Sequence, residues 1–128
     1  MKTLTINNTD LHFEHKNWKN EILFWKDEMK SFQNRLDELV NKWTNKTVLK
    51  ELDQFQNNFI IQKEKIGELL NEIDNHEHNI AQHYKANEDV IDVTHFKYHE
   101  IFRGKLDTQR EMYNDLKKSF FRFLTKYM

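Results

Sequence analysis

Apolar and aromatic residues recur along nearly the whole chain at alternating steps of three and four positions, the spacing of a supercoiled helix. We call these places seam positions, and they fall into three runs. The first run comprises Leu11, His15, Trp18, Ile22, Trp25, Met29, Phe32, Leu36, Leu39 and Trp43. The second comprises Val48, Leu52, Phe55, Phe59, Gln62, Ile66, Leu69, Ile73, His76, Ile80, His83, Asn87 and Val90. The third comprises His95, His99, Phe102, Leu106, Gln109, Tyr113, Leu116, Phe120, Phe123 and Tyr127.

Two breaks in this spacing divide the chain into three helices. Of the 33 seam positions, 25 are apolar or aromatic and none is Lys, Arg, Asp or Glu. The step lengthens to five residues twice, from Trp43 to Val48 and from Val90 to His95. Each break coincides with β-branched residues or residues that cap helices. The pattern therefore predicts helices near 10–43, 47–88 and 93–127, joined by tight turns.

Short connections make consecutive helices antiparallel, so we predict one all-α domain over residues 1–128, an up-down-up three-helix bundle. The heptad spacing gives it a left-handed supercoil, and at about 1.5 Å per residue the rod is roughly 50 Å long. The alternative architecture is one continuous helix through residues 87–94, where there is neither proline nor glycine. The five-residue step argues against it, because it would turn the seam away from its partner.

Composition narrows the function classes. The 20 basic and 21 acidic residues nearly balance, which favours neither nucleic acid nor an anionic membrane as partner. The absence of cysteine excludes disulfides, thiolate metal sites and thiol catalysis. The N-terminus has no apolar signal region and no segment reaches the roughly 18 apolar residues of a membrane span, so we expect a soluble, cytoplasmic protein. With no phosphate loop or nucleophile motif, enzymatic activity is the less favoured outcome.

The candidate chemistry lies in the seven histidines, which occupy three short stretches of the chain. These residues are His12, His15, His76, His78, His83, His95 and His99. In an up-down-up bundle the three stretches share one end. Five of the imidazoles occupy seam positions, whereas His12 flanks the seam and His78 should face water. Turns near residues 45 and 91 would set His15 opposite His76, and His83 opposite His99 about 10 Å further along.

Imidazole is the commonest protein metal ligand, so this end of the bundle predicts a transition-metal site. His95 and His99 stand four residues apart, the spacing by which one helix presents two imidazoles to one ion. With His83 they are the predicted principal ligands. Further ligation would come from His12, His15 or His76. The two levels leave room for two ions.

Nitrogen ligands without thiolate favour Zn, Fe, Cu or Ni over Ca or Mg. Carboxylates can complete the ligand shell or orient an imidazole from outside it. Those near the predicted levels are Glu14, Glu72, Glu88 and Asp92.

The competing hypothesis is a non-catalytic interaction or assembly module. Its buried histidines would be a polar layer that fixes helix register, as Gln62, Gln109 and Asn87 would be. Alternatively, they would form a layer that loosens when the imidazoles become protonated. A homo-oligomer surface would come from off-seam apolar residues, namely Phe24, Ile60, Ile61, Ile101 and Phe121.

Overall fold

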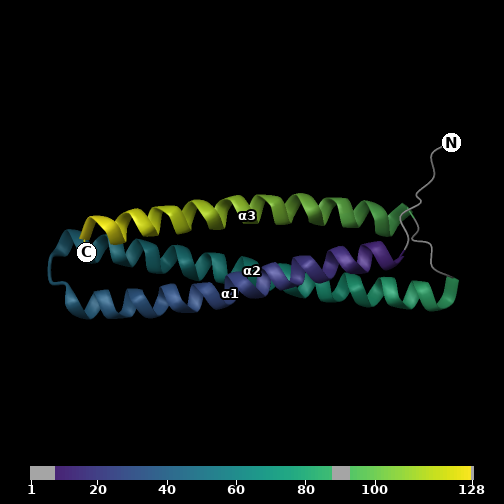
Figure 1. Cartoon of the computed structure of the whole chain (residues 1–128), viewed down its shortest axis with the longest axis horizontal. Helices are drawn as coiled ribbons and strands as arrows, with labels where there is room; N and C mark the ends of the chain where they lie inside the picture. The colour runs from purple at the N-terminus through teal and green to yellow at the C-terminus, as the bar shows by residue number, and fades with distance from the viewer. Residues whose placement is uncertain (1–7, 88–92, 128) are drawn as a thin grey trace.

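The computed structural model describes residues 8–87 and 93–127, with side chains described over 12–79 and 96–127. Three long helices lie side by side: α1 (Asn8–Lys42), α2 (Lys46–Asn87) and α3 (Val93–Tyr127) (Figure 1). The predicted all-α, up-down-up bundle is confirmed. The continuous-helix alternative is wrong, because α3 runs back along α2. Among the described residues, no helix is long and apolar enough to cross a membrane.

The N-terminus of α2, directly after the turn from α1, is capped by an asparagine side chain. Asn45 Oδ1 accepts hydrogen bonds from the backbone N–H groups of Thr47, at 2.8 Å, and Val48, at 3.2 Å. These two donors have no partner within the helix, so the side chain stabilises its start. A connection this short makes the two helices antiparallel.

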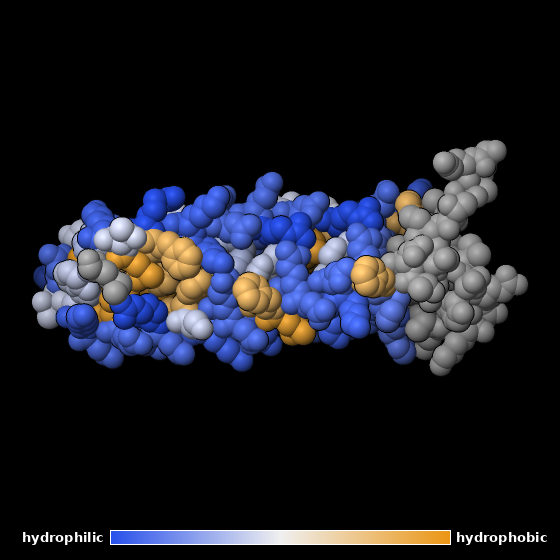
Figure 2. Space-filling model, in the orientation of Figure 1, coloured by the Kyte–Doolittle hydropathy of each residue, from blue (hydrophilic) through white to orange (hydrophobic). Residues whose placement is uncertain are grey.

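The core follows the seam. Every described side chain that is buried occupies a seam position. Towards the α1–α2 turn this core is aromatic, with ring centroids 5.2–5.5 Å apart. The rings belong to Phe32, Phe55, Phe59, Phe120 and Phe123. Figure 2 shows apolar spots separated by hydrophilic surface on the face in view.

A charge ladder joins α1 to α3 along one groove. Its three ion pairs recur every seven residues, and the partners of each pair are 89 residues apart. The pairs are Glu14–Arg103 at 2.8 Å, Glu21–Arg110 at 2.7 Å and Glu28–Lys117 at 2.7 Å. Acidic and basic residues that flank two parallel seams pair in this way, so the ladder identifies the register of α1 against α3.

We predict strong coupling between the two amides of the mid-bundle polar layer, in which Gln109 Nε2 donates a hydrogen bond to Gln62 Oε1. Gln109→Leu leaves the Gln62 amide without its buried partner and should lower the free energy of unfolding by about 1–3 kcal/mol. Adding Gln62→Leu removes the stranded group and should recover most of the loss. Urea unfolding of the wild type, Gln109→Leu, Gln62→Leu and the double variant measures the coupling free energy between the two amides. Strictly additive losses of stability would contradict the pairing.

Candidate metal centre

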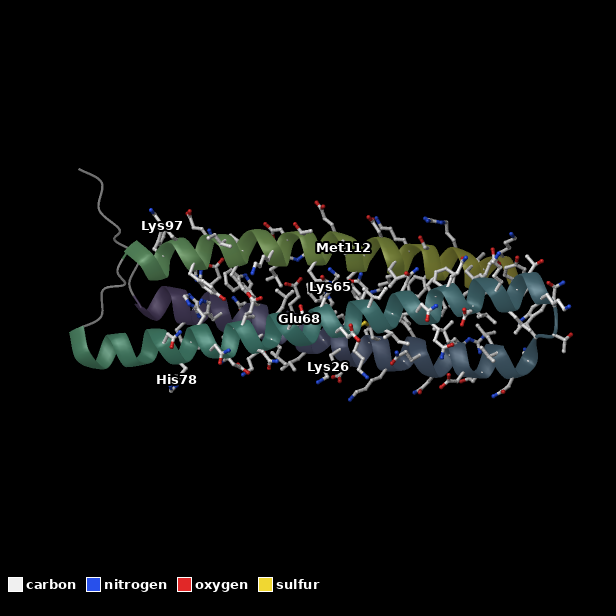
Figure 3. All side chains as sticks on the ribbon, turned by 180° about the vertical axis from the view of Figure 1, so that it is seen from behind. Lys26, Lys65, Glu68, His78, Lys97 and Met112 are labelled. Atoms are coloured by element: carbon white, nitrogen blue, oxygen red, sulfur yellow. The ribbon has the colours of Figure 1, made fainter. Side chains whose placement is uncertain are left out.

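Three buried imidazoles, one from each helix, meet near the end of the bundle opposite the α1–α2 turn. They belong to His15, His76 and His99, whose exposed fractions are 1%, 5% and 0%; we call them the histidine trio. One nitrogen of each ring lies within 4.8 Å of the other two. His78 of α2 is exposed as predicted and points away from the bundle (Figure 3). The trio is thus a candidate set of three nitrogen ligands.

The three rings share one level because α3 lies one heptad away from the alignment predicted above. His15 does lie opposite His76, with ring centroids 4.9 Å apart. His99 lies at the level of His15 and not one level further along as expected, since its Nδ1 lies 2.8 Å from His15 Nε2. The side chain of His83, its expected partner, lies outside the described residues. A slide of seven residues keeps every seam position facing inward, so the seam alone does not reveal it.

A chain of hydrogen bonds runs from the surface into the trio. Arg103 donates two hydrogen bonds to the carboxylate of Glu14, from Nε at 3.1 Å and Nη2 at 2.8 Å. His99 Nε2 lies 2.7 Å from Glu14 Oε1 and donates to it. Because the Nε2 atom of this neutral ring carries the proton, Nδ1 is a bare acceptor. His99 Nδ1 therefore accepts a hydrogen bond from His15 Nε2. In both neutral rings the proton is on Nε2.

With these tautomers, no donor faces the second nitrogen of His15, Nδ1. With its proton on Nε2, the neutral ring presents a lone pair at Nδ1. This atom is buried and has no hydrogen-bond partner among the described residues. Glu77 Oε1 lies 3.3 Å away, but an ionised carboxylate is also an acceptor. A buried polar atom in this position costs about 1–3 kcal/mol, and a bound cation or proton would relieve it.

Glu77 connects the trio to the surface of the α1–α2 groove. The same oxygen that faces His15 lies 2.7 Å from Nδ1 of His12, whose side chain is 65% exposed. Burial raises the pKa of Glu77, although the interaction with His12 works in the opposite direction. One carboxylate thus stands between an exposed imidazole and a buried one.

Aromatic rings enclose the trio on its other sides. The Trp18 ring lies 4.6 Å from His99 and 5.2 Å from Phe102, so it separates the imidazoles from the apolar core. The Tyr98 ring lies 4.4 Å from that of His76 and covers it. An ion among these imidazoles would therefore be largely screened from water.

Burial keeps the imidazoles of His15 and His99 neutral. It lowers the pKa of His15 to about 3, and repulsion from His99 and His76 in their charged forms adds to the effect. Burial also lowers the pKa of His99, with Glu14 acting against it. Burial raises the pKa of Glu14, but hydrogen bonds from Arg103 and His99 outweigh it and leave that pKa below its ordinary value. Neutral nitrogens are the form that binds metal.

The structure brings together only part of the predicted ligand set. His12 lies at the exposed rim, while Glu14 and Glu72 lie at the level of the trio, bonded to His99 and Tyr98. The remaining candidates lie outside the residues whose side chains are described, and these are His83, His95, Glu88 and Asp92. Their part in ligation stays a prediction.

Two residues of the site, Glu77 and Arg103, were not among the predicted ones. Both flank the seam, so their partners depend on helix register. A signal for Arg103 is present in the sequence, since acids at 14, 21 and 28 and bases at 103, 110 and 117 repeat every seven residues. Glu77 directly follows a seam histidine, and it belongs to no such charge repeat that would have identified it.

No protein-family model matches the chain, and no curated protein or solved structure matches it either. The geometry of the trio therefore carries the functional argument.

We predict that the metal-free protein loses stability as the pH falls below about 6.5. His15 has a pKa of 6.5 when unfolded and about 3 when folded, so the unfolded chain binds more protons between these values. Its contribution is fully present above the upper value and is lost towards the lower one, at up to about 1.4 kcal/mol per pH unit. Urea unfolding in chelator between pH 8 and pH 5 measures the slope.

His15→Leu should reduce this slope, whereas His78→Ala, at an exposed position of α2, should leave it unchanged. Equal slopes for wild type and His15→Leu would show that the buried ring does not titrate as we expect.

Proposed function

We propose that this bundle binds a transition-metal ion between His15, His76 and His99. The observation that carries the proposal is the pair of facing nitrogens, His15 Nε2 and His99 Nδ1, whose rings each direct their other nitrogen at a carboxylate. Metal-binding histidines almost always have such an outer partner, which fixes the ring and raises its basicity. Glu14 would serve His99 in this way, and Glu77 would serve His15.

An ion would also remove the conflict in the proton positions. In the metal-free chain the only proton of His15 sits on Nε2, and Nδ1 faces a carboxylate without a hydrogen bond. With a metal ion at Nε2, the proton would reside on Nδ1 and be donated to Glu77. Both rings would then have one nitrogen on the ion and one N–H on a carboxylate. Every polar atom in this part of the network would have a partner.

The donor set limits which ion is expected. Three imidazoles without a thiolate suit Zn, Cu, Ni or Fe, and a fourth position remains for water or another side chain. From the wider set predicted from sequence, His83 or His95 would supply that position or a second ion. Because the three ligands come from three helices, binding would stabilise the folded bundle, by about 2.7 kcal/mol at a free concentration one hundred times Kd.

We predict that Zn²⁺ or Ni²⁺, added to untagged protein stripped with chelator, raises its thermal unfolding temperature and binds with one ion per trio. His99→Ala should abolish this binding, because it removes a ligand from the centre. Glu14→Gln should weaken it about 10- to 100-fold through the outer partner. Calorimetric titration gives affinity and stoichiometry, with circular dichroism as the check on folding.

His78→Ala removes an exposed histidine from the same helix and should bind like wild type. The proposal fails if no ion binds wild type with Kd below about 10 µM, roughly 7 kcal/mol. It also fails if His99→Ala binds as tightly as wild type.

A second candidate function is self-assembly through the outer faces of the helices. All five off-seam apolar residues named from the sequence are exposed, by 44–60%. Two of them, Ile60 and Ile61, are adjacent on the outer face of α2, where neighbouring apolar side chains favour contact with another surface.

If that pair forms an oligomer contact, Ile60→Glu should dissociate the oligomer without unfolding the subunit, because it places a charge in an apolar interface. Light scattering measures the mass, and Val40→Glu on α1, an exposed apolar residue outside that set, is the matched control. A wild-type monomer at high concentration would exclude this candidate.

A further inference from the structure

Each groove between two helices has a carboxylate near the level of the histidine trio, and two of these are capped by a fixed cation. Glu14, in the α1–α3 groove, receives both hydrogen bonds of Arg103. Glu72, in the α2–α3 groove, lies 3.3 Å from the ammonium of Lys105. A divalent cation approaching along either groove would meet a permanent positive charge before it reached an imidazole.

The α1–α2 groove is different. It holds a cavity of about 310 Å³ whose lining includes His12, His15 and Glu77. Two lysines also line this cavity, but among the described residues neither forms an ion pair with Glu77: Lys19 pairs with Asp74 at 2.8 Å and acts on Glu77 only through its charge, and Lys16 is exposed. The carboxylate of Glu77 instead faces the imidazole of His12, a side chain of the kind that binds metal ions.

The contacts in this groove form a continuous line from water to the trio. His12 is 65% exposed and its Nδ1 lies 2.7 Å from Glu77 Oε1. The same oxygen lies 3.3 Å from Nδ1 of His15, which is 99% removed from solvent. That buried nitrogen has no hydrogen bond, and His15 is one of the residues that line the cavity. Groups that can bind a metal ion thus follow one another from the surface to the buried ring, with neighbouring atoms 2.7 and 3.3 Å apart.

We propose that His12 and Glu77 form the entry route of the metal ion, capturing it at the rim of the α1–α2 groove and passing it inward to His15 and the trio. This inference rests on the proposed metal site. Dehydrating a divalent ion in one step is costly, and exchange of its waters for protein ligands one at a time lowers that cost. An exposed imidazole can turn between solvent and the groove, whereas the buried rings are held by packing.

A route has a signature that a permanent ligand lacks. Removing a residue used only in passage raises the same barrier in both directions, so association and dissociation slow by one factor and Kd stays constant. Removing a permanent ligand weakens Kd, mainly through faster dissociation. His12 distinguishes the two roles better than Glu77, because Glu77 also serves as the outer partner of His15.

The test uses the full-length chain, with Ni²⁺ as the probe. Trp18 reports loading, since its ring lies 4.6 Å from that of His99 and its fluorescence is quenched by a paramagnetic ion. Stopped-flow mixing gives the association rate, excess chelator gives the release rate, and calorimetry gives Kd. We expect His12→Ala to slow loading and release alike by about tenfold, equivalent to about 1.4 kcal/mol of barrier. Kd should remain that of wild type, and His78→Ala should change no rate.

Other results separate the two proposals. Unchanged rates in His12→Ala, with wild type binding normally, would refute the entry route and leave the metal site standing. A weaker Kd with faster release would make His12 a ligand and also refute the route. A wild-type chain that binds no Ni²⁺ or Zn²⁺ would overturn the metal site, and the route with it.

Discussion

The alignment of α1 against α3 decides where every candidate ligand lies. The seam repeats every seven residues, so a slide by one heptad keeps the core apolar. In one direction, however, such a slide would place Leu106 beside His15, where His99 lies in the structure. The charge ladder separates these registers. One slide sets Glu28 against Leu124 and loses a pair, and the opposite slide sets Arg35 against Lys117. Each exposed pair contributes only about 0.2–1 kcal/mol, but the observed register is the one in which all three pairs form.

This register gives the bundle two chemically different ends. Near the α1–α2 turn the core is filled by phenylalanine rings, which bury large apolar areas and supply stability. At the other end the equivalent seam positions hold imidazoles, with Trp18 at the boundary. A buried polar layer of this kind is less stabilising than an apolar one, since its polar atoms need partners. The unpartnered Nδ1 of His15 marks where that requirement is unmet.

Most of the fold could be predicted from the sequence, because a seam with this spacing identifies both the helices and their inward faces. The buried side chains followed it, including the three inward-facing histidines. The position of each histidine along the bundle axis could not be predicted, because a slide of seven residues leaves the apolar pattern unchanged. His99 was therefore assigned to His83 and not to His15. Glu77 and Arg103 were missed for the same reason: a residue that flanks a seam acquires its partner only when the register is known.

Burial affects the metal proposal in two opposing ways. It makes a charged site expensive, because an ion loses its hydration on entering. It also removes the chief competitor, since protons and metal ions bind the same nitrogens. With a folded pKa of about 3, His15 is uncharged throughout the neutral range and keeps one ring nitrogen without a proton. The carboxylates of Glu14 and Glu77 offset part of the desolvation from outside the ring of nitrogens. A buried trio with acidic outer partners therefore suits a divalent cation better than a proton, which each imidazole would have to hold alone.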